Sequence, residues 1–175
     1  MNSFTAKVAT YIDDSRDFSV IGLSFGGMVA VELTRLLKPR HTILISSVSC
    51  SSEIPPMLKR SGRLHLDKLL PARAIPVLFP LANWFGGITS PEDRKILKAG
   101  IRDSDPHYMK WAIHEVLNWQ RKDRPDNIFH IHGDADRTFP IEYVKADRVI
   151  HGGGHFMILT HADEVSSILR QQLGD

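Results

Sequence analysis

Cysteine and long apolar runs are nearly absent from this chain of 175 residues. Its single cysteine, Cys50, cannot form an internal disulfide, so we expect a fold that needs no oxidising compartment and a cytoplasmic location. No apolar stretch approaches the ~20 residues that cross a bilayer, and no charged start leads into an apolar run at the N-terminus, so we expect neither a membrane anchor nor an export signal. The net charge is also small, because 22 Lys and Arg face 20 Asp and Glu, and this balance argues against nucleic acid as a partner.

The order of apolar segments predicts an α/β fold with a parallel sheet. The composition, 42% hydrophobic and 24% charged, is that of a globular domain with its own core. Residues 42–45 are continuously apolar or β-branched, as in a parallel strand covered on both faces. The hydrophobic patterns predict four strands, at 18–21, 42–45, 128–132 and 148–150. They also predict helices at 4–12, 25–37 and 162–173, so that the first strand, helix and second strand form a right-handed βαβ unit.

A mostly helical insertion is expected to interrupt the sheet-forming core. The expected boundaries are core at 1–52, insertion or lid at 53–126 and core again at 127–175. The insertion carries 13 Lys and Arg against 9 Asp and Glu, a net charge of +4. Within it, Ser90 and Asp105 each precede a proline and are predicted helix N-caps. Near the C-terminus, Thr160 and Asp163 resemble a capping box.

A serine lies at the predicted junction between the first strand and the next helix. The segment from Gly22 to Gly26 reads Gly-Leu-Ser-Phe-Gly, which fits the pattern G-x-S-x-G around Ser24. Small flanking residues permit a strained turn that exposes the hydroxyl, and the free N–H groups at the start of the helix favour negative charge there. The alternative is a glycine-rich turn that binds phosphate, but no P-loop lysine follows.

A serine nucleophile needs a base, and the base needs an acid that orients it. In a parallel sheet both are expected after later strands. Asp134 and Asp136 follow the strand at 128–132, and His151 and His155 follow the strand at 148–150. The residues alone leave both pairs open, although the three glycines before His155 permit close approach to another backbone.

Three segments of this chain resemble the α/β-hydrolase family. Gly-Leu-Ser-Phe-Gly-Gly, His-Gly-Asp-Ala-Asp-Arg-Thr-Phe-Pro and Gly-Gly-Gly-His-Phe are similar, in this order, to the nucleophile, acid and histidine segments of the family. The resemblance implies a catalytic triad of Ser24, Asp136 and His155, with the backbone N–H of Phe25 as one oxyanion donor. It also implies a lid formed by the insertion, no metal or organic cofactor, and cleavage of carboxylic esters or thioesters of a small-molecule acyl substrate through an acyl-enzyme.

The chain departs from the family pattern before the nucleophile. Only 23 residues precede Ser24, where the family places further strands and the loop that supplies the second oxyanion donor. A second hypothesis is therefore a catalytically impaired fragment or a binding module of the same fold. The strand at 18–22 is also expected to be an exposed edge without lysine or proline, through which the chain would self-associate.

Two further expectations concern metal and substrate. Two histidines and two aspartates alternate along one strand and the turn after it: His130, His132, Asp134 and Asp136. This spacing suits a divalent metal, although the metallo-β-lactamase type of run requires histidine where Ala135 stands. These residues make a metal-dependent hydrolase a remote alternative.

Aromatic residues and the positive charge of the insertion favour an apolar or amphiphilic acyl chain. These aromatic residues are Trp84, Phe85, Trp111 and Trp119.

Overall fold

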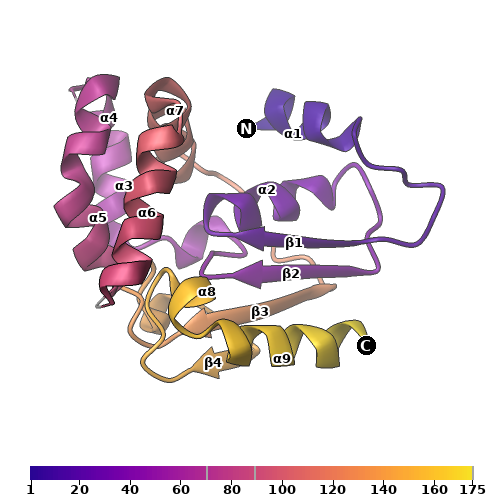
Figure 1. Ribbon diagram of the computed structural model, residues 1–175. Coiled ribbons are helices and arrows are strands. Elements are labelled where there is room, and N and C mark those ends of the chain that lie inside the picture. The colour runs from indigo at the N-terminus through magenta and orange to yellow at the C-terminus, as the bar shows by residue number, and fades with distance from the viewer. Residues whose placement is uncertain (70, 89, 175) are drawn as a thin grey trace.

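The computed structural model describes residues 1–69, 71–88 and 90–174, and it contains a four-stranded parallel sheet between helices (Figure 1). The strands lie side by side in chain order and are β1 (Ser19–Leu23), β2 (His41–Ile45), β3 (Ile128–Gly133) and β4 (Arg148–Ile150). The helices of the core are α1 (Asn2–Ala9), α2 (Phe25–Leu33), α8 (Met157–Thr160) and α9 (Ala162–Leu173). The predicted fold class, α/β with a parallel sheet, is confirmed.

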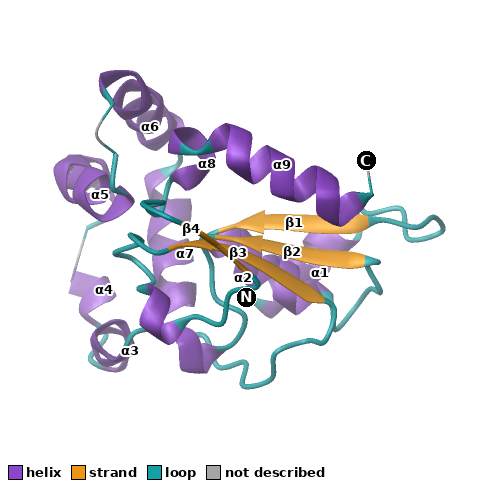
Figure 2. Ribbon diagram, turned by 90° about the horizontal axis from the view of Figure 1, so that it is seen from below, coloured by secondary structure: helices purple, strands orange, loops and turns teal. Residues whose placement is uncertain are grey.

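Helices cover both faces of the sheet. Figure 2 shows α9 on one face and α1 with α2 on the other. Because side chains alternate along a strand, Leu44 packs with Met28 and Val31 of α2, whereas Ile43 packs toward Val165 of α9. Four of the five residues of β2 are buried, as its continuously apolar sequence predicts.

The segment between β2 and β3 is mostly helical and lies at the carboxyl ends of the strands (Figure 1). Its helices are α3 (Pro56–Arg63), α4 (Leu66–Leu69), α5 (Phe79–Gly86), α6 (Pro91–Asp103) and α7 (Pro106–Leu117). Both predicted caps are confirmed, since Ser90 accepts a hydrogen bond from Asp93 N and Asp105 accepts one from His107 N. None of the helices in the described ranges is long and apolar enough to cross a membrane.

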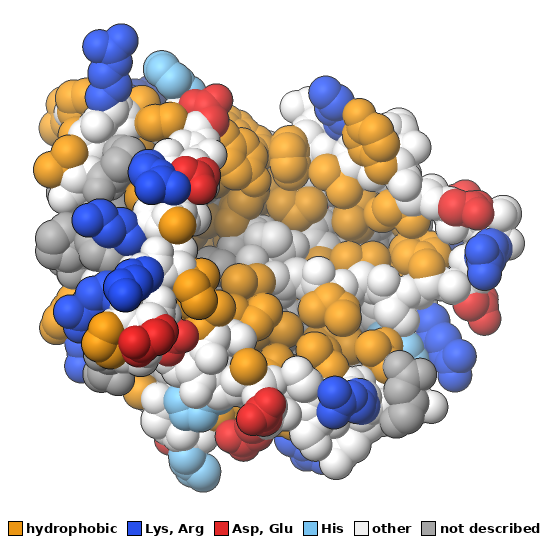
Figure 3. Space-filling model, viewed as in Figure 1, with side chains coloured by type: hydrophobic (Ala, Val, Ile, Leu, Met, Phe, Trp, Pro, Cys, Tyr) orange, Lys and Arg blue, Asp and Glu red, His pale blue; other side chains and the backbone are white. Residues whose placement is uncertain are grey.

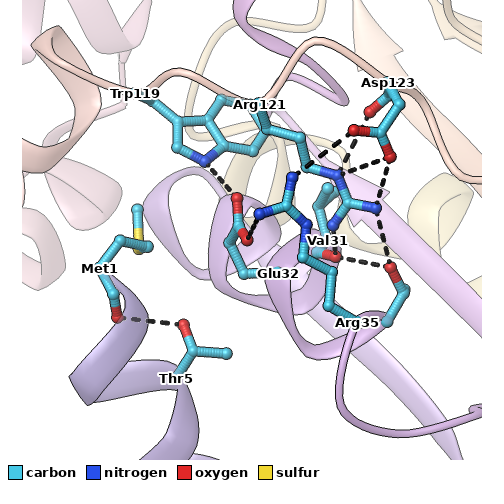
Figure 4. A network of polar contacts seen from close by, with 9 residues as sticks. Met1, Thr5, Val31, Glu32, Arg35, Trp119, Arg121 and Asp123 are labelled. Carbon is cyan, nitrogen blue, oxygen red and sulfur yellow. Dashed lines mark hydrogen bonds and ion pairs between the residues drawn. The ribbon is translucent and has the colours of Figure 1, made fainter.

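A polar network fixes the return from α7 to the sheet (Figure 4). Trp119 Nε1 donates to Glu32 Oε1 on α2 over 2.7 Å, and Arg35 forms an ion pair with the same carboxylate at 3.3 Å. Arg121 donates to the carbonyl of Val31 at the end of α2 and to Asp123. Trp119 is therefore a structural residue rather than a substrate contact.

Three expectations about the helices are corrected. The predicted helix at 4–12 ends at Ala9, because the next N–H groups bond three residues back and Tyr11 is exposed. The helix predicted to reach 37 ends at Leu33, where the same change of hydrogen bonding begins the turn into β2. The capping box is wrong: Thr160 is the last residue of α8 and its hydroxyl contacts the ring of His161.

Candidate active site

The register of the sheet brings the ends of its strands to one edge. Leu23 pairs with Ile45, Ile45 with Ile131, and Gly133 with Ile150. The segments that follow β1, β3 and β4 therefore leave the sheet together, on the side where α3 to α7 lie (Figure 1).

Ser24 occupies a strained turn between β1 and α2. Its φ of 51° lies in the left-handed region that residues other than glycine seldom adopt, and its N–H donates to Ile45 O over 2.9 Å. Glycine is required at Gly22, because a Cβ there would overlap the backbone of Gly26. The hydroxyl of Ser47 donates to the carbonyl of Ser24 over 2.6 Å, a support that no local sequence signal indicates.

The structure brings Ser24, His155 and Asp136 together in one chain of hydrogen bonds. Ser24 Oγ lies 2.8 Å from His155 Nε2, and His155 Nδ1 lies 2.8 Å from Asp136 Oδ2. Because a carboxylate only accepts hydrogen bonds, the proton of the neutral ring sits on Nδ1, and Nε2 accepts from the serine hydroxyl. Asp136 is 3% exposed and His155 is 7% exposed, so water is largely excluded from both.

The backbone of its own loop holds Asp136. Its Oδ1 accepts from the N–H groups of Thr138 at 2.7 Å and Phe139 at 2.9 Å, which leaves Oδ2 for His155. His132 Nε2 donates to the carbonyl of Phe139 over 2.7 Å and lies 3.6 Å from Asp136 Oδ2. The imidazole of His132 thus supports the loop that carries Asp136, residues 134–140, which we call the acid loop.

His132 in turn contacts His130, which is fully buried in the core. Since Nε2 of His132 must carry a proton to donate to Phe139 O, Nδ1 of the neutral ring accepts, and His130 Nε2 is its donor at 3.3 Å. Burial, with the neighbouring His132 and Arg124, lowers the pKa of His130 to about 3. Burial also lowers the pKa of His132. Both rings are therefore neutral near pH 7.

Asp134 and His151, the alternative acid and base, contact each other and not the chain of hydrogen bonds at Ser24. His151 Nδ1 lies 2.8 Å from Asp134 Oδ2, and Gly152 N donates to Asp134 Oδ1 over 2.7 Å. These two contacts lower the pKa of Asp134, the histidine contact more than the backbone contact. The side chain of His151 is 93% exposed. Asp134 and His151 therefore lie outside the chain of hydrogen bonds that joins Ser24, His155 and Asp136.

The glycines before His155 permit the close approach that their sequence indicates. A Cβ at Gly133 would overlap the carbonyl of Gly153, and a Cβ at Gly154 would overlap the carbonyl of Gly86 at the end of α5. Phe156 N donates to the same Gly86 carbonyl over 3.3 Å. The histidine loop is therefore held between β3 and the helical insertion.

An apolar cavity of about 260 Å³ opens beside Ser24 and Phe25. Most of its wall comes from α7, α3 and the acid loop, through Ala112, Ile113, Val116, Leu117, Leu58 and Phe139. Hydrophobic side chains also surround the hollow visible between the insertion and α1 in Figure 3. Phe25 is the first residue of α2, where backbone N–H groups have no partner within the helix, so its N–H is available beside the serine.

The proposed metal ligands do not form a metal site. His132 donates to a carbonyl and contacts His130, Asp136 bonds His155, and Asp134 bonds His151. Across residues 1–69, 71–88 and 90–174, no three His, Cys, Asp or Glu side chains are grouped to hold a metal ion. The geometry gives the metal-dependent alternative no support.

The chain is similar to several solved structures. A bromoperoxidase from Bacillus anthracis has 17% identity and a TM-score of 0.66, over 99% of this chain and 74% of that one. A hydrolase from Pseudomonas aeruginosa PA01 has 16% identity and a TM-score of 0.71, over 98% of this chain and 71% of that one. A thermophilic esterase from Thermogutta terrifontis has 18% identity and a TM-score of 0.61, over 90% of this chain and 64% of that one.

Such identities establish the fold and leave the reaction open. No curated protein matches the chain in sequence. The model of the alpha/beta hydrolase family, in contrast, matches residues 3–168, nearly the whole length. The order of the strands, the turn at Ser24 and this match agree, and the chain belongs to the alpha/beta hydrolase family.

Proposed function

We propose that this protein is a serine hydrolase that cleaves carboxylic esters or thioesters of small-molecule substrates through an acyl-enzyme. The observation that carries the proposal is the pair of 2.8 Å contacts that join Ser24 to His155 and His155 to Asp136, beside an apolar cavity. A partly buried serine nucleophile, followed by a buried base and a buried acid in this order of contact, is what acyl transfer by a serine requires.

In the proposed reaction, Ser24 Oγ forms a bond to the acyl carbon while His155 Nε2 takes its proton. Asp136 stabilises the imidazolium, and the Phe25 N–H donates to the oxygen of the tetrahedral intermediate. The bond to the leaving oxygen or sulfur then breaks, and His155 gives the proton to that atom. Water attacks the acyl-enzyme in the same way and restores Ser24.

The test combines a covalent label with turnover. A fluorophosphonate probe should label the wild-type protein at Ser24 and should not label Ser24→Ala, because only an activated serine reacts. Hydrolysis of a p-nitrophenyl ester by the same preparations measures the complete site. The His151→Ala protein is the matched control, since its histidine lies in the same loop but contacts Asp134. Absence of labelling in the wild-type protein would contradict the proposal.

The second candidate, a binding module with impaired catalysis, predicts labelling with almost no turnover. A serine hydrolase that loses one oxyanion donor loses about 10² to 10³-fold in turnover, so a site that works with the Phe25 N–H alone would give this outcome. We also propose that the protein is cytoplasmic, because its sole cysteine, Cys50, is free and buried.

A further inference from the structure

Two apolar cavities adjoin beneath the helical insertion. The first, of about 260 Å³, contains Ser24 and Phe25 in its wall, and the second, of about 290 Å³, contains Phe85 and Arg137. Leu58 and Thr138 line both cavities. These two residues therefore lie where the two cavities meet.

The first cavity has the position and the chemistry of a site for the acyl chain. The acyl carbon must lie at Ser24 Oγ and its oxygen near the Phe25 N–H, and both residues line this cavity but not the second. Among the described residues that line it, Thr138 is the one polar side chain besides Ser24. Such a surface binds an alkyl chain and offers no partner to a charged or strongly polar group.

Thr138 and Leu58, the two shared lining residues, differ in how closely they are tied to the catalytic residues. Thr138 belongs to the acid loop, where its N–H donates to Asp136 over 2.7 Å, so its place is set by the acid. Leu58 lies on α3, is half-buried, and packs with its side chain against the core under α2. Leu58 is therefore the shared lining residue whose side chain can change in size without the loss of a hydrogen bond to Asp136.

We propose that the first cavity binds the acyl chain of the substrate and that Leu58 limits the length of that chain by closing the way into the second cavity. This inference rests on the proposed function, with Ser24 as the nucleophile. It names the substrate class as esters or thioesters of apolar, uncharged acyl chains. Trp111 and Trp119, two of the aromatic residues from which the sequence predicts an apolar acyl chain, are not among the lining residues of this cavity: Trp111 packs edge-on against Phe25 at 5.5 Å, and Trp119 bonds Glu32.

The experiment measures kcat/KM for p-nitrophenyl esters from acetyl to palmitoyl with the full chain and three variants. Leu58→Ala should join the cavities and move the optimum to longer chains, with a gain of about fourfold for each CH₂ that becomes buried. Leu58→Phe should fill the passage and move the optimum to shorter chains. Leu64→Ala is the control, because Leu64 follows the same helix and is 69% exposed.

The comparison is made within each variant, across chain lengths, so a loss of folded protein does not alter the result. Opposite shifts in Leu58→Ala and Leu58→Phe, with an unchanged profile in Leu64→Ala, would support the inference. If Leu58→Ala fails to fold, the shift in Leu58→Phe alone decides. Active variants with the wild-type profile would overturn the inference and leave the proposed function intact. Absence of fluorophosphonate labelling in the wild-type protein would overturn both.

Discussion

At the scale of single residues, two aspartates and two histidines compete for the same roles, and their partners separate them. The pair His155 and Asp136 is buried and reaches Ser24, whereas His151 and Asp134 form an exposed pair. We expect Ser24→Ala and His155→Ala each to lower esterase turnover at least about 10⁴-fold. Initial rates on a p-nitrophenyl ester measure the effect.

The matched controls are His151→Ala and Asp134→Asn, which should keep most of the activity. Their contact is exposed to solvent and contributes little to stability. A loss in His151→Ala as large as that in His155→Ala would contradict the assignment of the base.

His132 is a positioning residue in the proposed site, because it acts on substrate only through the acid loop. Its Nε2 holds the carbonyl of Phe139, whose own N–H binds Asp136. We expect His132→Leu to lower kcat by about 10²-fold with little change in KM, since a small displacement of Asp136 misaligns His155. His132→Gln retains a donor at a similar distance along the side chain and should recover most of kcat. Equal losses in both variants, or a change in KM alone, would count against this role.

At the scale of elements, β3 carries two neutral histidines into the core, and this makes the fold sensitive to acid. The pKa of His130 falls from 6.5 to about 3 on folding because the ring is buried. As the pH drops below about 6.5, the unfolded chain takes up a proton that the folded chain does not bind. Stability contributed by the neutral ring is therefore present above pH 6.5 and is lost as the pH falls toward 3.

Urea unfolding at a series of pH values tests this dependence. The free energy of unfolding should fall by up to about 1.4 kcal/mol per pH unit for His130 in the acid range. His130→Gln removes the titrating group, keeps a donor toward His132, and should show a shallower fall. The same slope in wild type and variant would show that His130 does not control the acid sensitivity.

Sequence patterns predict those elements that are determined by a few neighbouring residues. Examples are the continuously apolar strand β2, the capped starts of α6 and α7, and the turn at Ser24. Helix ends such as Leu33 and Ala9 are set by where the chain must turn, which periodicity does not encode.

Polar contacts between distant segments are beyond such patterns. Ser47 bonds Ser24 across 23 positions, and Trp119 bonds Glu32 across 87. A serine in a serine-rich stretch and a tryptophan in a loop carry no local sign of these partners. The glycines before His155 favour it over His151, but both histidines follow the same strand, and only the packed loop determines which ring reaches Ser24.

At the scale of the whole molecule, the sheet is less well covered at β1 than at β2 and β3. Within the described part of the chain, β1 pairs with β2 alone and forms one edge of the sheet. Ile21 at its centre is 46% exposed, and Leu23 on the same face packs only partly against the cluster under α9. In Figure 1, α9 crosses in front of β3 and β4 rather than β1.

This edge leads to a prediction about assembly. The five residues of β1, Ser-Val-Ile-Gly-Leu, include no charge and no proline, the residues with which exposed edges usually resist pairing. Two copies related by a twofold axis would pair β1 with β1 and bury Ile21 against its counterpart. We therefore expect the chain to self-associate in solution at micromolar concentration, with a mass by light scattering above that of one chain.

The variant Ile21→Lys should shift the protein to monomers, because a lysine at the centre of the edge places like charges opposite one another in the paired strands. Leu64→Lys makes the same chemical change at a position that is 69% exposed and outside the sheet, so it should leave the association unchanged. The two variants differ only in where the charge lies, and a difference between their masses therefore assigns the contact to β1. A wild-type chain that stays monomeric and unfolds cooperatively at the same concentration would rule this assembly out.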